Sequence, residues 1–160
     1  MPTEYLIALP VEDMPLGATY ARDEKLPLHC TVFQWFRLSP GLSCAQLNRK
    51  MMLLASRVEQ GYIELVSERP ALFGLNDDIP CHLLERNEDL SALHTLLLMF
   101  LATHCHFTVP VEWLGAGYRP HVTDRGEISF PPSTRHRAKN LVLVERNEEK
   151  KVVKSVHELG

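Results

Sequence analysis

The sequence of 160 residues lacks a long apolar run, an excess of basic residues and a regular metal motif. Its longest apolar stretch, residues 96–102, is far shorter than the roughly 20 residues that a membrane helix needs. There is also no charged-then-apolar leader, so we expect a cytoplasmic protein with no membrane partner. The net charge of −3 argues against a surface that binds long nucleic acid by neutralising many phosphates. A ligand with a small or terminal phosphate group is more compatible with this net charge.

The four cysteines show no Cys-x-x-Cys spacing. In a reducing compartment they are expected to be free thiols, mostly buried. His104, Cys105 and His106, together with Cys81 and His82, offer nitrogen and sulfur donors for zinc, but their spacing matches no known finger or ribbon. We therefore expect no metal and no cofactor, and keep a zinc-dependent protein as an alternative to be tested.

The hydrophobic pattern predicts strands and two amphipathic helices. Strands are expected over residues 4–9, 28–36, 62–66, 71–75, 79–85, 109–113 and 118–125, and a closing hairpin over 140–145 and 152–159. One helix should follow a capping box of Ser43 and Gln46, and the second should follow the cap residue Asn87. Residues 10–27 and 129–139 show no period and are expected to be loops. The first of these leads into His29, so it either covers a site there or is a solvated connection.

Two short motifs stand out from this background. His29 and Thr31 lie in one apolar run, and His121 and Thr123 lie in another, a little over half the chain away. Residues two apart in a strand point to the same side, so each run presents an imidazole and a hydroxyl on one face. Eight histidines and eight threonines in 160 residues would give less than one His-x-Thr by chance. A single strand histidine is more often a core residue, but a matched pair suits acid-base chemistry on a phosphate.

These motifs resemble the signature of the two-histidine (2H) phosphoesterase superfamily, which includes 2′-5′ RNA ligase-like proteins and cyclic nucleotide phosphodiesterases. Its pattern is His, a hydrophobic residue, Ser or Thr, then a hydrophobic residue, occurring twice. Cys30 and Val32 complete the first copy. In the second copy Val122 fits, but Asp124 stands where a hydrophobic residue is usual.

The repeated motif and this resemblance together imply the fold. We expect an α+β protein with one bilobal domain over residues 1–160, because the chain is too short for two ordinary domains. The two similar lobes would divide near residue 87, each with an antiparallel sheet and a packed helix. The active-site cleft would lie between the lobes.

The expected function is a metal-independent phosphodiesterase, a hydrolase of the 2′-5′ RNA ligase-like kind with a role in RNA processing. By the resemblance, its substrate would be a 2′,3′-cyclic phosphate, a 2′-5′ phosphodiester or a small cyclic nucleotide. RNA ends or small nucleotides would be its partners, and we expect a monomer. His29 and His121 would be the general acid and base, in either order, because an ordinary histidine pKa of about 6.5 lets both protonation states coexist. Thr31 and Thr123 would donate hydrogen bonds to the phosphate.

Three further residues are candidates for the same site. Strand alternation places Arg119 on the face of His121, where a guanidinium would favour an anion. It also places Phe33 and Trp35 on the face of His29, where they would stack a base, although core packing is the commoner use of such residues. A non-catalytic module that binds RNA ends or nucleotides on the same fold is the alternative function.

Overall fold

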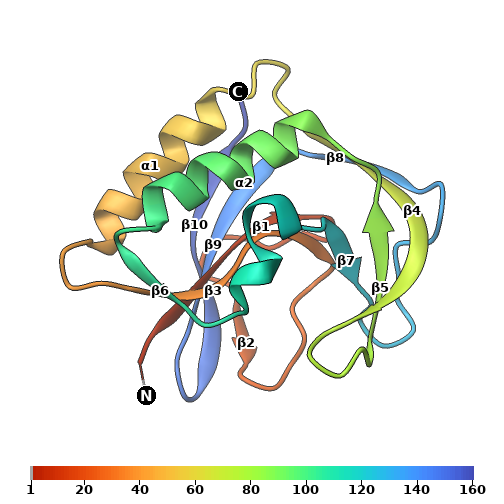
Figure 1. Cartoon of the computed structure of the whole chain (residues 1–160), viewed down its shortest axis with the longest axis horizontal. Coiled ribbons are helices and arrows are strands. Elements are labelled where there is room, and N and C mark those ends of the chain that lie inside the picture. Colours follow the sequence, from red (N-terminus) through yellow and green to blue (C-terminus); the bar gives the residue numbers. More distant parts are fainter. Residues whose placement is uncertain (1) are drawn as a thin grey trace.

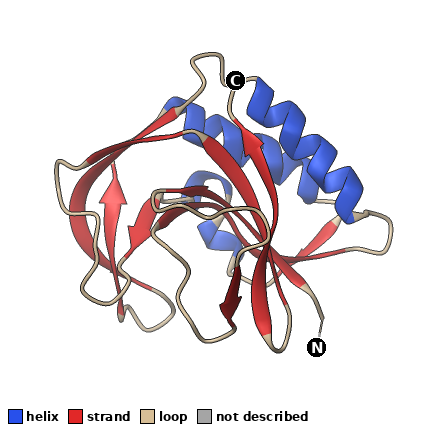
Figure 2. Cartoon of the chain, turned by 180° about the vertical axis from the view of Figure 1, so that it is seen from behind, coloured by secondary structure: helices blue, strands red, loops and turns tan. Residues whose placement is uncertain are grey.

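The structure, a computed structural model, describes residues 2–160 and consists of one curled antiparallel sheet and two helices. The strands are β1 (Glu4–Pro10), β2 (Thr19–Ala21), β3 (His29–Leu38), β4 (Ile63–Phe73), β5 (Ile79–Leu84), β6 (Cys105–Phe107), β7 (His121–Thr123), β8 (Arg135–Ala138), β9 (Asn140–Arg146) and β10 (Lys150–Glu158). The helices are α1 (Cys44–Ser56) and α2 (Glu88–Leu101), and η1 (Val111–Trp113) and η2 (Gly115–Gly117) are 3-10 turns. The predicted α+β class with a single domain is confirmed. Figures 1 and 2 show the two helices side by side on one side of the curled sheet.

The strand order brings the two motif strands together at the middle of the sheet. The order is β2-β10-β9-β1-β3-β7-β5-β4-β8, with β6 pairing to the far end of β3. The sheet does not divide near residue 87, since β9 pairs with β1 and β8 pairs with β4. Each half of the sheet therefore contains strands from both parts of the sequence. The neighbours β3 and β7, which carry the two motifs, join these halves.

Both predicted helix starts are confirmed by their capping contacts. The Ser43 hydroxyl accepts from the Gln46 backbone N–H at 3.1 Å, and the Gln46 side chain accepts from the Ser43 N–H at 2.8 Å. The Asn87 side-chain oxygen accepts from the Leu90 N–H at 3.1 Å. Such caps satisfy N–H groups that have no partner inside the helix. Within residues 2–160, neither helix is long and apolar enough to span a membrane.

The sheet separates a helix-covered face from the face that carries the motifs. On β1, Ile7 and Leu9 belong to the large core that includes both helices, whereas Leu6 and Ala8 belong to a smaller cluster on the other side. Cys30 and Val32 on β3 and Val122 on β7 belong to the large core. Because side chains alternate along a strand, the histidine and threonine of each motif face away from the helices.

Four local predictions are wrong. The strand pair expected around residues 62–75 is one strand, β4, which runs through Pro70. Pro70 is tolerated there because β8 pairs only with residues 63–66, so the proline lies at a free sheet edge on that side. Residues 109–113 form the turn η1 after Pro110, not a strand. The expected loops 10–27 and 129–139 contain the short strands β2 and β8, which pair with β10 and β4 at the two edges of the sheet.

Candidate active site

The four motif side chains gather on one patch of the sheet. Cys30 on β3 pairs antiparallel with Val122 on β7, which sets His29 opposite Thr123 and Thr31 opposite His121. All four line one cavity of about 300 Å³ and are half-buried. The two histidines are diagonal neighbours across the strand pair, a relation that typically separates residues by about 7 Å. A ligand the size of a phosphate group fits between side chains at this spacing.

Each histidine is held by the same hydrogen bond. His29 Nδ1 lies 2.7 Å from the carbonyl oxygen of Pro27, and His121 Nδ1 lies 2.8 Å from that of Arg119. A carbonyl oxygen only accepts, so Nδ1 donates in both residues and carries a proton. The second nitrogen, Nε2, is then the atom that gains or loses a proton in each ring. Both imidazoles therefore present a titrating Nε2 to the cavity that they line.

The surroundings favour the neutral form of both histidines. Burial lowers the pKa of His29, the Pro27 carbonyl opposes that shift, and the positive charge of Lys151 adds to it. Burial likewise lowers the pKa of His121, with a further lowering from the charge of His29 and an opposing effect of the Arg119 carbonyl. Each imidazole resists a positive charge on the other. A second proton on the pair is therefore disfavoured, so one neutral and one protonated ring is preferred over two protonated rings.

The cavity walls include residues that the sequence analysis did not identify. A second cavity of about 250 Å³ adjoins the first, and the two share Thr31, Gln34, Phe73, Gly74, Trp113 and His121. The ring of Phe73 meets that of His121 edge-on, with centroids 4.1 Å apart. Lys25, Leu26 and Lys151 also line the larger cavity, so residues preceding His29 cover part of the site. The only sequence signal for this role was the lack of a regular pattern in residues 10–27.

The stacking role predicted for Phe33 is wrong, whereas Trp35 does reach the cavity. Phe33 is only 1% exposed and its ring packs against those of His94 and Phe36 in the core. The cause is a pair of irregularities between β1 and β3, where Ala8 faces Thr31 but Ile7 faces Phe33. The first extra residue on β3, between Thr31 and Phe33, reverses the alternation, and the second, between Phe33 and Phe36, restores it, so Trp35 again faces the cavity. Trp35 lines the larger cavity, with the guanidinium of Arg146 over its ring at 4.0 Å.

Arg119 is placed beside His121, as the alternation predicts. It is exposed, and it lines the smaller cavity together with Thr31 and His121. Its backbone carbonyl orients the His121 ring. Its role in binding phosphate stays a prediction.

Different long-range contacts support the two motifs. The Glu12 carboxylate accepts from the Leu28 N–H at 2.8 Å and pairs with Arg125 at 2.8 Å, which links the flanks of the two motifs. Asp124, the residue that departs from the family pattern, accepts from His82 Nδ1 at 3.1 Å. Beneath the cleft, the Tyr118 hydroxyl donates to the Thr31 carbonyl at 2.7 Å.

Residues 2–160 contain no set of ligands that would support the zinc alternative. No group of three or more His, Cys, Asp or Glu side chains in this part of the chain is arranged to hold a metal ion. Cys105 is buried on β6, while His104 and His106 on either side of it are exposed. These three residues do not converge on one point.

Comparison with solved structures defines the class of fold. A phosphoesterase crystal structure aligns with a TM-score of 0.58 and 18% identity over 99% of each chain. E. coli LigT complexed with 3′-AMP aligns with a TM-score of 0.54 and 17% identity, over 99% of this chain and 99% of LigT. A second LigT structure, complexed with NADP⁺, gives the same score and identity over 99% of this chain and 98% of LigT. No family model matches the sequence, and no curated protein does.

These alignments span almost the whole of both chains at low sequence identity. The protein therefore has the fold of the LigT-like phosphoesterases, as the motif resemblance implied. These low identities establish the fold alone, and the reaction is inferred from the residues of the cleft.

Proposed function

We propose that the protein is a phosphodiesterase of the two-histidine superfamily, acting on 2′,3′-cyclic phosphates, 2′-5′ phosphodiesters or small cyclic nucleotides. The observation that carries the proposal is the matched pair of histidines. His29 and His121 each donate from Nδ1 to the carbonyl two residues earlier, and both line one cavity with Thr31 and Thr123. This gives one proton acceptor and one proton donor on the two sides of a phosphate.

The reaction follows from these groups. The neutral histidine takes a proton at Nε2 from the attacking water or hydroxyl, whose oxygen forms a bond to phosphorus. The bond from phosphorus to the leaving oxygen breaks, and the protonated histidine gives its Nε2 proton to that oxygen. The hydroxyls of Thr31 and Thr123 donate hydrogen bonds to the non-bridging oxygens, where negative charge grows. These groups perform both proton transfers, so the proposed reaction requires no metal ion or cofactor.

Nucleotide binding supports the choice of substrate. The solved LigT structures hold 3′-AMP and NADP⁺, which both contain nucleotide phosphates. In this protein, the aromatic side chains of Phe73, Trp113 and Trp35 lie in the walls around the histidines. Aromatic rings of this kind suit a nucleobase attached to the reacting phosphate. RNA ends and small nucleotides are therefore the proposed partners.

The test is turnover of a panel of 2′,3′-cyclic nucleotides, 2′-5′ dinucleotides and cyclic nucleotides, with EDTA present. We expect turnover that falls by about 10²-fold or more in His29→Ala and in His121→Ala, the effect of losing a general acid or base. His106→Ala is the matched control, because His106 is exposed on β6 and lines neither cavity. Saturable nucleotide binding by a folded protein with no turnover would instead establish the non-catalytic binding module.

A further inference from the structure

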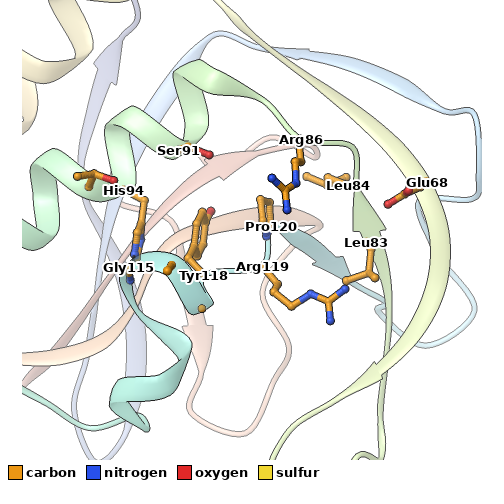
Figure 3. A pocket seen from close by; sticks show the side chains of 13 residues that line it. Glu68, Leu83, Leu84, Arg86, Ser91, His94, Gly115, Tyr118, Arg119 and Pro120 are labelled. Atoms are coloured by element: carbon orange, nitrogen blue, oxygen red, sulfur yellow. Dashed lines mark hydrogen bonds between the residues drawn. The ribbon is translucent and has the colours of Figure 1, made fainter.

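A third cavity, of about 560 Å³, lies next to the catalytic cleft and plays no part in the proposed reaction. Its lining includes Glu68, Arg86, Ser91, Thr95 and Arg119 (Figure 3). Residues 117–119 line both this cavity and the smaller cavity beside His121, so the two are neighbours across one segment of chain.

The backbone places this cavity directly beyond the catalytic pair. Leu83 on β5 pairs with His121, and the Leu84 N–H donates to the Pro120 carbonyl at 3.0 Å. The contact between these two segments thus continues past the catalytic histidine. Arg119 precedes His121 by two residues, a span of about 7 Å in an extended chain. One ligand can therefore reach from His121 into the third cavity.

The two arginines of this cavity are unpaired. Arg125, Arg135 and Arg146 each form an ion pair with a glutamate. Within residues 2–160, the guanidiniums of Arg86 and Arg119 have no hydrogen-bond or ion-pair partner. Figure 3 shows them on either side of Pro120. Both guanidiniums are exposed and line the same cavity, where two such groups can bind one phosphate.

The charge and polarity of the lining define the ligand further. Two arginines oppose one carboxylate, that of Glu68, so the charged side chains leave one positive charge in excess. Ser91 and Thr95 are four residues apart on α2 and add hydroxyl donors on one side of that helix. His94 contributes no charge, because its Nδ1 donates to the Val32 carbonyl and its Nε2 accepts from the Gly115 N–H. This excess of positive charge favours an anionic group such as a phosphodiester.

The fold also keeps the wall between the two sites thin. Gly117 lines both cavities, and a Cβ atom at this position would lie 1.7 Å from the carbonyl oxygen of Glu112. Any larger residue would displace the backbone there, because real Cβ atoms do not approach so closely. Glycine is therefore required for the close turn that brings the two cavities side by side.

We propose that the cavity between Arg86 and Arg119 binds a second phosphodiester of the same substrate, so that the enzyme prefers an oligonucleotide end to a mononucleotide. This inference rests on the proposed function, since it assumes that the reacting phosphate lies between the two histidines.

The experiment compares three substrates: adenosine 2′,3′-cyclic phosphate, the dinucleotide ApA ending in a 2′,3′-cyclic phosphate, and the same dinucleotide with an uncharged methylphosphonate linkage. We expect kcat/KM to be about tenfold higher for the charged dinucleotide than for the uncharged one, the effect of one charge-assisted contact at an open site. In Arg86→Gln this ratio should fall to about one, mainly through KM. Arg49→Gln, at an exposed position on α1 outside all these cavities, is the matched control and should keep the ratio.

The outcomes separate this inference from the proposed function. Turnover of all three substrates with equal kcat/KM for the two dinucleotides, unchanged in Arg86→Gln, would overturn the second site and leave the phosphodiesterase intact. If no substrate is turned over, calorimetric titration of the two dinucleotides still tests the second site. The charged dinucleotide must bind the wild-type protein more tightly than the uncharged one and must lose that advantage in Arg86→Gln. Addition of inorganic phosphate tests whether the third cavity binds a free anion instead of a part of the substrate. A change in mononucleotide turnover that Arg86→Gln abolishes would assign the cavity to a free ion and contradict the inference.

Discussion

The two motifs present the same side chains, a histidine and a threonine, from very different settings. His29 begins β3, a ten-residue strand, whereas His121 begins β7, which has three residues and follows two 3-10 turns. Nevertheless, each ring is fixed by a hydrogen bond to the carbonyl two residues earlier. The shared geometry comes from the short extended segment itself. The long-range contacts, Glu12 for the first motif and His82 for the second, differ and serve to hold that segment in place.

Substitution of each histidine should cause the largest loss of activity. It should also show which histidine acts as the general acid and which as the general base. We expect His29→Ala and His121→Ala each to lower kcat by about 10² to 10⁴-fold on a natural diester. A diester with a p-nitrophenolate leaving group needs no proton, so the variant that lacks the general acid should recover on it and the other should not. Steady-state kinetics of both variants on both substrates gives the assignment. Equal recovery of both variants would contradict separate acid and base roles.

Removal of each threonine hydroxyl tests whether both motifs contact the phosphate. Thr31→Val and Thr123→Val keep the shape of the side chain, and each should lower kcat by roughly 10 to 10²-fold through loss of a donor to the transition state. Thermal unfolding serves as the control for a change in stability. A normal rate in one variant would show that only the other motif stabilises the charge on phosphate.

The pH profile reports on the pair as a unit. Catalysis needs one protonated and one neutral ring, and burial lowers the pKa of both His29 and His121 below the ordinary 6.5. The maximum of kcat/KM should therefore lie below pH 6.5. Above that maximum, kcat/KM should fall by about tenfold per pH unit as the general acid loses its proton. A maximum above pH 7 would contradict the lowered pKa values.

The smallest effects should come from the contacts that support each motif. Glu12→Gln weakens the pairing with Arg125, a partly exposed ion pair, so we expect a loss of at most about 1 kcal/mol in the free energy of unfolding. Asp124→Asn removes the charge that faces His82. We expect each change to lower kcat about fivefold by misplacing the nearer histidine. Denaturant unfolding and kinetics of both variants, with Glu59→Gln as an exposed control, separate stability from positioning.

Comparison of particular elements shows which features can be predicted from sequence. Ser43 and Asn87 cap their helices as expected, because capping depends on residues within one turn. Each histidine shares a face with its threonine as expected, because alternation holds over three residues, and the pairing of β3 with β7 brings the two motifs together. The predicted face of Phe33 is wrong because a bulge between β1 and β3 shifts the alternation. Nothing in residues 28–36 alone indicates that shift.

The sequence by itself determined the candidate catalytic groups of this protein: two histidines, two threonines, and the short strands that orient each pair. Only the tertiary structure decided what surrounds them. Trp113 and Lys151 reach the cleft from distant segments, and Arg86 and Arg119 line one cavity because β5 and β7 pair. Local geometry follows from backbone sterics over a few residues, whereas these contacts depend on strand pairing across more than 30 positions of the chain.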